Sequence, residues 1–218
     1  KESFWKLRFD EEKAPVLREP APTQAAGVLP GFEDWLKSNT FEQKQKGFHA
    51  VNVRCPLGDI TPDQMRKLAK ISRVFCGGRL RTTILQNLLL LWVPKESLKA
   101  LYSQLQPLGL AMKGAEEITD ITRCPGADTC QIAITHSKGL AFEMGKLFAN
   151  GLGSDSAFKD ITVKISGCTN SCGHHHIGNL GFHGASKIVD GRAVPHYQLL
   201  VGGHTAKNGV AVFGKRIA

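Results

Sequence analysis

Cysteines are the residues of this 218-residue chain best suited to chemistry, and four of the six fall into two spaced pairs. Five residues separate Cys124 from Cys130, and three separate Cys168 from Cys172. Both pairs lie beside glycines, which allow backbone angles that other residues avoid. Two loops could therefore present four thiolates to one centre.

The spacing within each pair bears on what that centre could be. Zinc sites built from cysteines prefer two residues between paired ligands, because a tight turn then aims both thiolates at one small ion. Wider spacings suit a wider object such as a [4Fe–4S] cluster, which thiolates also hold. From spacing alone, three interpretations stay open: a cluster, a zinc ion, or core cysteines that share no ligand.

The remaining cysteines and a run of histidines need separate interpretations. Cys55 and Cys76 have no paired spacing, and we expect both to be buried structural thiols. His174, His175 and His176 follow the last paired cysteine directly. One interpretation is that a histidine contacts a bound cofactor; the other is that alternate histidines face solvent or cap a neighbouring element.

The first part of the chain alternates strand and helix patterns. Phe48 to Arg54 alternates apolar and polar residues, as a strand does. Thr61-Pro62-Asp63-Gln64 is a capping box with proline at the first helical position, and it predicts a helix to about Phe75. Its buried face should contain Met65, Leu68, Ala69, Ile71 and Ser72. Two strands and a helix are then expected over 79–84, 87–93 and 94–106. This order is most of a ferredoxin-like unit.

The second part begins near Gly114, where the composition changes. Apolar spacing predicts a helix over Thr129–Asn150, followed by a strand over Ile161–Ser166. A hairpin is expected after that, because Asp190-Gly191 is a strong turn signal between two strand patterns. Its strands should be Leu180–Val189 and Pro195–Val201.

Charge and composition limit the function classes. The net charge is +9, but the basic residues are scattered and no run of five or more occurs. We therefore expect a generally basic surface, or an anionic ligand or acidic partner, and no nucleic acid. The longest apolar run, Leu88 to Val93, is too short to cross a bilayer. With no signal peptide pattern, the prediction is a cytoplasmic protein with no membrane association.

The start of the chain looks like part of something longer. It does not begin with methionine, and residues 14–31 are rich in proline without any periodicity. We interpret 1–39 as a linker or N-terminal arm, of which 1–13 could belong to a preceding unit.

Two sets of residues resemble a known family. Cys124-Pro-Gly-Ala-Asp-Thr-Cys130, Ile165-Ser-Gly-Cys168-Thr-Asn-Ser-Cys172-Gly and Ile177-Gly-Asn-Leu-Gly-Phe182 resemble the cluster-binding domain of sirohaem-dependent sulfite and nitrite reductases. Upstream, Arg81-Thr-Thr83-Ile-Leu-Gln86-Asn87 resembles the family's Arg-x-Thr-x-x-Gln-Asn segment. The resemblance covers roughly residues 40 to 205.

The resemblance implies a fold and a division into domains. The expected fold class is α+β, with a ferredoxin-like half-domain followed by the mixed α/β sirohaem- and [4Fe–4S]-binding domain of nitrite and sulfite reductases. The implied domains are 40–114 and 115–218.

The resemblance also implies a set of site residues. Cys124, Cys130, Cys168 and Cys172 would ligate one [4Fe–4S] cluster, and Cys172 would also bridge to the sirohaem iron. Asn170, between two ligands, could hydrogen-bond the macrocycle or a cluster sulfur. A contact with sirohaem or with another half-domain is implied for the following residues: Arg81, Thr83, Gln86 and Asn87. Without the resemblance, these four would be interpreted as ordinary strand and turn residues.

The implied function is the six-electron reduction of a small oxyanion, sulfite or nitrite. Electrons would come from a donor such as ferredoxin or a flavoprotein. Family enzymes contain two related halves, and this chain resembles the second, so the missing N-terminal half is an expected partner. The alternative is a non-catalytic iron–sulfur electron-transfer or partner-binding module; a zinc or nucleic-acid protein is a third possibility.

Overall fold

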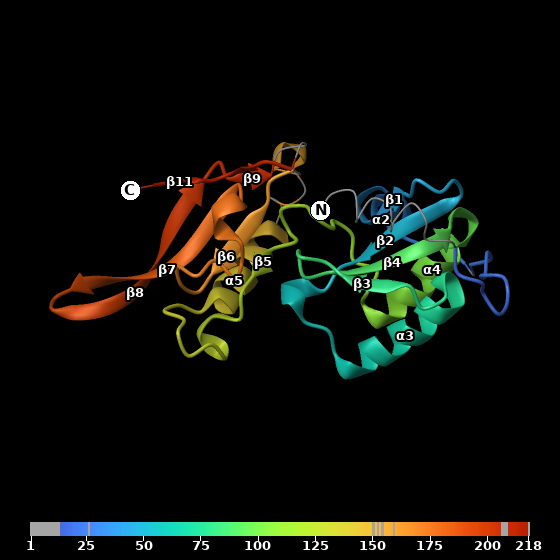
Figure 1. Cartoon of the computed structure of the whole chain (residues 1–218), viewed down its shortest axis with the longest axis horizontal. Coiled ribbons are helices and arrows are strands. Elements are labelled where there is room, and N and C mark those ends of the chain that lie inside the picture. Colours follow the sequence, from blue (N-terminus) through green and yellow to red (C-terminus); the bar gives the residue numbers. More distant parts are fainter. Residues whose placement is uncertain are drawn as a thin grey trace. The chain divides into compact units, whose positions relative to one another are not determined.

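The computed structural model describes residues 14–25, 27–149, 151, 153, 155–158, 160–205 and 209–217. The chain divides into two compact units (Figure 1). Unit 1 contains residues 1–53, 61–82 and 88–111, and unit 2 contains 54–60, 83–87 and 112–218. Two short segments thus belong to unit 2 although their sequence neighbours belong to unit 1. The contiguous boundaries expected after residues 39 and 114 stay predictions, and the suggestion about residues 1–13 lies outside the described residues.

Unit 1 is a four-stranded antiparallel sheet with helices, in the strand order β1-β2-β4-β3. Its strands are β1 (Thr40–Glu42), β2 (Phe48–Val53), β3 (Leu80–Thr82) and β4 (Leu88–Pro94). Its helices are α2 (Phe32–Asn39), α3 (Pro62–Cys76) and α4 (Leu98–Leu105), with short 3₁₀ turns on both sides of α4. Helix α3 contacts both β4 and α4. The helix predicted over 94–106 is therefore a shorter α-helix flanked by tighter turns.

Helix α3 forms where its capping signals predict. The Thr61 hydroxyl accepts from the backbone N–H of Gln64 at 3.2 Å, and the Gln64 side chain accepts from the N–H of Thr61 at 2.9 Å. Leu68, Ile71 and Ser72 are buried as predicted. Met65 was predicted to be buried and is instead 41% exposed. Periodicity assigns a residue to a helix face, but it does not say where the covering surface ends.

The segment expected to be a linker contains helix α2, which the sequence analysis did not anticipate. Phe32 and Trp35 are buried, and their ring centroids lie 5.5 and 5.1 Å from that of Tyr102 in α4. The Tyr102 hydroxyl also donates to the backbone oxygen of Pro30 at 2.6 Å. These aromatic contacts attach residues 30–39 to unit 1.

Unit 2 contains a five-stranded mixed sheet in the order β11-β8-β7-β6-β5. The strands are β5 (Thr122–Arg123), β6 (Val163–Ser166), β7 (Leu180–Val189), β8 (Arg192–Val201) and β11 (Lys215–Arg216), and two short strands, β9 (His204–Thr205) and β10 (Ala211–Val212), pair separately. β5, β6 and β7 are mutually parallel, whereas β8 is antiparallel to β7. The predicted hairpin is confirmed: Asp190 and Gly191 have φ values of 50° and 74°, as a tight hairpin turn requires.

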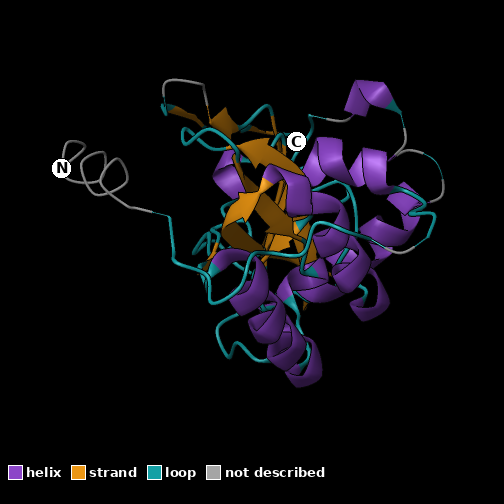
Figure 2. Ribbon diagram, turned by 90° about the vertical axis from the view of Figure 1, so that its right-hand side faces the viewer, coloured by secondary structure: helices purple, strands orange, loops and turns teal. Residues whose placement is uncertain are grey.

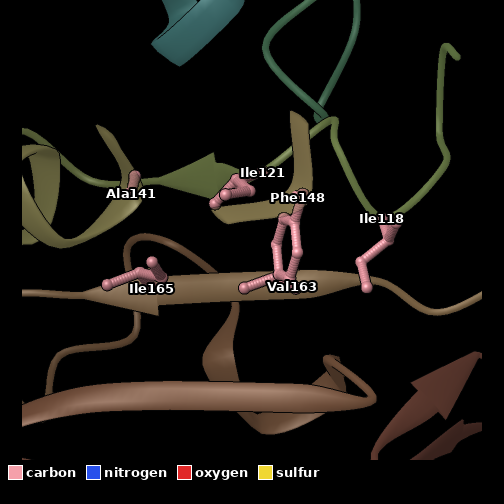
Figure 3. Close-up of a cluster of buried hydrophobic side chains, with 6 residues drawn as sticks. All are labelled: Ile118, Ile121, Ala141, Phe148, Val163 and Ile165. Atoms are coloured by element: carbon pink, nitrogen blue, oxygen red, sulfur yellow. The ribbon is translucent and has the colours of Figure 1, made fainter. Parts of the chain in front are cut away.

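The core of unit 2 lies between its sheet and helix α5 (Ser137–Ala149). Figure 3 shows the buried cluster, in which Phe148 of α5 lies beside Val163 of β6. Its members are Ile118, Ile121, Ala141, Phe148, Val163 and Ile165. The chain combines sheets with helices (Figure 2), which is the α+β organisation that the sequence predicts.

The helix predicted over Thr129–Asn150 is wrong in its first part. The helix begins at Ser137, and the residues before it form a loop. Ile132 and Ile134 supplied part of the apolar pattern, but their side chains are 66% and 39% exposed. Backbone hydrogen bonds hold this loop instead. The predicted end of the helix, Asn150, lies outside the described residues.

Within the described ranges, none of the helices is both long and apolar enough to cross a membrane.

Candidate functional site

The two cysteine loops leave the sheet of unit 2 at the same edge. Strand β5 ends at Arg123 and β6 ends at Ser166, and the two strands pair in parallel. Cys124 follows β5 directly, and its N–H donates to the backbone oxygen of Ile165 at 3.0 Å. Cys168 comes two residues after β6. Because carboxyl ends of parallel strands meet at one edge of a sheet, the fold brings the starts of both loops together.

Gly167 joins the two loops. Its N–H donates to the Sγ of Cys124 at 3.0 Å, and its carbonyl oxygen accepts from the N–H groups of Ile134 and Thr135 at 2.8 and 3.1 Å. A Cβ at this position would lie 2.9 Å from the Cα of Gly126. Glycine is therefore required at position 167, because two backbones approach each other closely there. The hydrogen bonds from Ile134 and Thr135 to Gly167 hold this segment in a loop, where the sequence predicted the first turns of a helix.

Several polar groups lie beside the sulfur of Cys124. Besides the N–H of Gly167, the hydroxyl of Ser137 lies 3.3 Å from Sγ and donates to the backbone oxygen of Cys124 at 2.7 Å. Ser137 is the first residue of α5, so the partially positive end of a helix lies beside this thiol. Backbone N–H groups that point at sulfur are typical surroundings of a metal-bound thiolate.

Burial differs among the four paired cysteines. Cys124 is buried, Cys130 and Cys168 are half-buried, and Cys172 is exposed. No three His, Cys, Asp or Glu side chains of the described ranges lie close enough together to hold one metal ion. The assignment of the four cysteines to one cluster stays a prediction. Cys55 and Cys76 are buried, as predicted.

The loop between Cys168 and Cys172 turns sharply back onto the sheet. Ser171 and His174 have φ values of 61° and 57°, in the left-handed region that residues other than glycine rarely adopt. The chain therefore turns tightly at both positions. Gly173 donates its N–H to the hydroxyl of Ser166 at 3.1 Å, and a Cβ on it would lie 2.0 Å from the carbonyl oxygen of Ile165.

The structure buries the middle histidine of the run. His175 is only 1% exposed, whereas His174 and His176 are half-buried. The ring of His175 lies 4.1 Å from that of His176 and 4.8 Å from that of His183. Burial, together with these two neighbouring imidazoles, lowers the pKa of His175 from 6.5 to about 4. His175 is therefore neutral at pH 7.

Two residues expected to contact sirohaem use their side chains within unit 2. The Gln86 amide donates to the backbone oxygen of Arg123 at 2.5 Å and accepts from its N–H at 3.0 Å. Asn87 is buried, accepts from the N–H of Cys55 at 2.9 Å and donates to the carboxylate of Asp120 at 2.6 Å. Both amides thus attach segment 83–87 to the rest of the unit.

The other expected contacts are placed differently. Arg81 is exposed and lies in β3 of unit 1, whereas Thr83 is half-buried and belongs to unit 2. The hydroxyl of Thr83 accepts from the N–H of Asn87 at 3.1 Å, which closes the turn. Asn170 is exposed within the second cysteine loop.

Arg123 is a candidate that the sequence analysis missed. It directly precedes Cys124, it is buried, and its guanidinium contacts the backbone oxygen of Leu57 and the carboxylate of Asp59, the latter at 3.1 Å. Asp59 also pairs with Lys138 at 2.6 Å. The guanidinium also lies 3.4 Å from the backbone oxygen of Cys124, at the start of the first cysteine loop. Its position at the end of a strand, next to a candidate ligand, was the available signal.

Comparison with known proteins gives consistent results over most of the chain. Residues 41–108 match the nitrite/sulfite reductase ferredoxin-like half domain. The chain is 25% identical over 191 residues to the ferredoxin–nitrite reductase of Synechococcus elongatus, covering 86% of this chain and 37% of that protein. It is 28% identical over 196 residues to the chloroplastic ferredoxin–nitrite reductase of Zea mays, covering 88% and 34%.

Other relatives are named for sulfite. The chain is 26% identical over 216 residues to sulfite reductase (ferredoxin) of Mycobacterium tuberculosis, covering 97% of this chain and 37% of that protein. It spans about a third of the length of the curated relatives that it matches. Among solved structures, the NirA protein of Mycobacterium tuberculosis aligns with a TM-score of 0.65 and 24% identity, over 94% of this chain and 36% of that one. The predicted fold class is thereby confirmed.

Proposed function

We propose that this chain, which is similar to nitrite and sulfite reductases over most of its length, is the cluster- and sirohaem-binding half of an oxidoreductase. Its reaction would be the six-electron reduction of sulfite or nitrite. The observation that carries this proposal is the junction at Gly167, where both cysteine loops leave one sheet edge and a backbone N–H meets the Sγ of Cys124. The names of several relatives include ferredoxin, which supports a ferredoxin as electron donor over a flavoprotein.

The donor set fits a [4Fe–4S] cluster. Cys124, Cys130, Cys168 and Cys172 would supply four thiolates from two loops, and thiolates are the ligands that such clusters use. When bound, the cluster and sirohaem would relay the donor's electrons to the oxyanion. Of the four, Cys172 is the exposed one, which leaves its sulfur accessible for a second contact with sirohaem iron.

This chain's own residues would orient and balance that centre. Gly167 donates to Cys124, while Arg123, linked through Asp59 to Lys138, provides positive charge beside it. The net charge of +9 suits a cofactor that carries carboxylates and an anionic substrate. We retain Arg81, Thr83 and Asn170 as candidate sirohaem contacts. Gln86 and Asn87 are assigned a different part, which is to position the 83–87 segment.

A second candidate function is an electron-transfer or partner-binding module without activity of its own. In that case a separate N-terminal half would be the partner, and mixing the two chains should give a complex in gel filtration. A cytoplasmic location stays a prediction.

The test of the main proposal compares three cysteine substitutions after anaerobic reconstitution. Cys172→Ser should lose most iron, sulfide and visible absorption, because a serine oxygen is a harder and poorer ligand for cluster iron. Cys55→Ser and Cys76→Ser are matched controls, since both thiols are buried outside the paired loops. Equal loss in all three variants, or loss only in the controls, would show that the wrong thiols are assigned. Zinc in place of iron would contradict the proposal outright.

A further inference from the structure

The hydroxyl of Ser166 connects the two ends of the second cysteine loop. Ser166 is the last residue of β6, two residues before Cys168. Its Oγ accepts from the N–H of Gly173 at 3.1 Å and lies 2.9 Å from the Nδ1 of His175, both beyond Cys172. We propose that Ser166 and His175 form a clasp that holds the Cys168–Cys172 loop in the geometry needed to receive a cluster. This inference rests on the proposed function, and it names two positioning residues for that site.

Both members of the clasp are fixed by burial. Ser166 and His175 are each 1% exposed. The ring of His175 lies close to the rings of His176 and His183, and His183 pairs in register with Ser166 across β6 and β7. His176 in turn stacks on Phe213 at 5.3 Å. The imidazole of His175 therefore has little freedom to leave the serine hydroxyl.

The backbone around the clasp has no spare room. A Cβ on Gly173 would lie 2.0 Å from the backbone oxygen of Ile165, and a Cβ on Gly181 would lie 2.0 Å from that of His175. Packing of this kind fixes how closely the loop approaches the sheet. The hydrogen bonds of the Ser166 hydroxyl fix the orientation of the loop, because the strength of a hydrogen bond depends on its angle as well as its length.

Only one nitrogen of His175 takes part in the clasp. One lone pair of the Ser166 oxygen is used by the N–H of Gly173, and the remaining bond joins Oγ to Nδ1 in either direction. Within the part of the chain that the structure describes, Nε2 is buried and has no hydrogen-bond partner. A substitution that restores a polar group at the Nδ1 position should therefore preserve the clasp.

The experiment uses the full 218-residue chain in its metal-free form, with four variants. Ser166→Ala removes the hydroxyl. His175→Phe keeps the ring but removes Nδ1, whereas His175→Asn keeps a polar group near the Nδ1 position and removes the ring. His176→Phe is the matched control, because it changes a neighbouring histidine that stacks on Phe213 and has no bond to Ser166. Circular dichroism shows which variants are folded.

Two rates report on the loop before any metal is added. In Ser166→Ala and His175→Phe we expect the amide of Gly173 to exchange its hydrogen, and Cys168 to react with iodoacetamide, about tenfold faster, as the loss of one buried hydrogen bond implies. His175→Asn and His176→Phe should stay within about threefold of the parent chain, and the double variant Ser166→Ala/His175→Phe should match the single ones. Equal acceleration in both phenylalanine variants would overturn the clasp, since ring packing would then be responsible.

Reconstitution with iron and sulfide separates this inference from the proposed function. If both hold, the parent chain and His175→Asn take up a cluster, and Ser166→Ala and His175→Phe take it up more slowly with an altered visible spectrum. Uptake and spectra identical in all variants, with unchanged Cys168 reactivity, would overturn the clasp and leave the function standing. If the parent chain takes up no cluster although the two rates change as expected, the proposed function fails while the contact between Ser166 and His175 is upheld.

Discussion

The side chain of Gln86 pairs with Arg123 as a neighbouring strand would. Its Nε2 donates to the backbone oxygen of Arg123 at 2.5 Å, and its Oε1 accepts from the backbone N–H of the same residue at 3.0 Å. Arg123 ends the edge strand β5 and precedes Cys124. One amide thus satisfies both backbone groups at the edge from which the first cysteine loop leaves.

Replacement of Gln86 should therefore destabilise unit 2. Gln86→Ala leaves a buried backbone N–H and C=O without partners, and we expect urea unfolding to show a loss of about 2 kcal/mol in the free energy of unfolding. Gln86→Glu, which can still accept from the N–H, should lose less. Gln104→Ala is the matched control: this glutamine is exposed on α4, so the change should stay within about 0.5 kcal/mol. A loss as small for Gln86→Ala as for the control would contradict the assigned role.

Two glycines of unit 2 should respond to alanine in opposite ways. Gly173→Ala places a methyl group 2.0 Å from the backbone oxygen of Ile165, so the second cysteine loop must move. Gly145 lies inside helix α5, and a Cβ there meets nothing within 4 Å. Gly145→Ala should therefore stabilise the protein by about 0.5–1 kcal/mol, through helix propensity.

Thermal unfolding of the two alanine variants provides the measurement. Gly173→Ala should unfold at a lower temperature than the parent chain, and Gly145→Ala at a higher one. A Gly173→Ala variant as stable as the parent chain would show that the loop can lie further from β6 than the structure places it.

The six thiols should differ widely in reactivity in the metal-free chain. Burial raises the pKa of Cys76 from 9.0 to about 12, and its Sγ donates to the backbone oxygen of Ser72 at 3.1 Å. The thiolate fraction at neutral pH is then roughly a thousandfold lower than for a thiol of ordinary pKa. Cys172 is exposed. Peptide mapping after brief alkylation should find Cys172 modified first and Cys76 last; early labelling of Cys76 would contradict its burial.

Sequence patterns predicted the elements whose signals are local. The capping box at Thr61 and the turn at Asp190-Gly191 specify backbone geometry within a few residues, and both are found where expected. The glycines beside the second cysteine pair are needed for close backbone approach, whereas the positive φ values in that loop belong to Ser171 and His174. Most of the longer strands and helices were predicted, but helix α2 was not. The assignment to a reductase family required recognition of the cysteine segments, because spacing alone left zinc and core thiols open.

Features that depend on distant partners could not be predicted in this way. Ile132 and Ile134 continue a helical pattern, but the backbone of Gly167, more than thirty residues away, binds their loop instead. The family resemblance implies a contact with sirohaem or another half-domain for Gln86 and Asn87, but nothing in the sequence shows that Arg123 and Asp120 face them. The burial of His175 between two other imidazoles likewise depends on the register of β6 with β7.

His175 should make the stability of the chain depend on pH in a defined window. Its pKa is lowered from 6.5 to about 4 by burial, with further contributions from His176 and His183. Between these two values the unfolded chain binds a proton that the folded chain does not. Stability is therefore fully present above about pH 6.5 and falls as the pH drops towards 4. From pH 6.5 to 5 the loss due to this group approaches ~2 kcal/mol.

Urea unfolding at pH 7 and pH 5 measures that loss. The parent chain should lose more stability on acidification than His175→Phe, which keeps a ring at this position but cannot bind a proton. His204→Gln is the control, since it removes an exposed histidine in β9. If His175→Phe loses as much stability as the parent chain between these pH values, the group that titrates is another one.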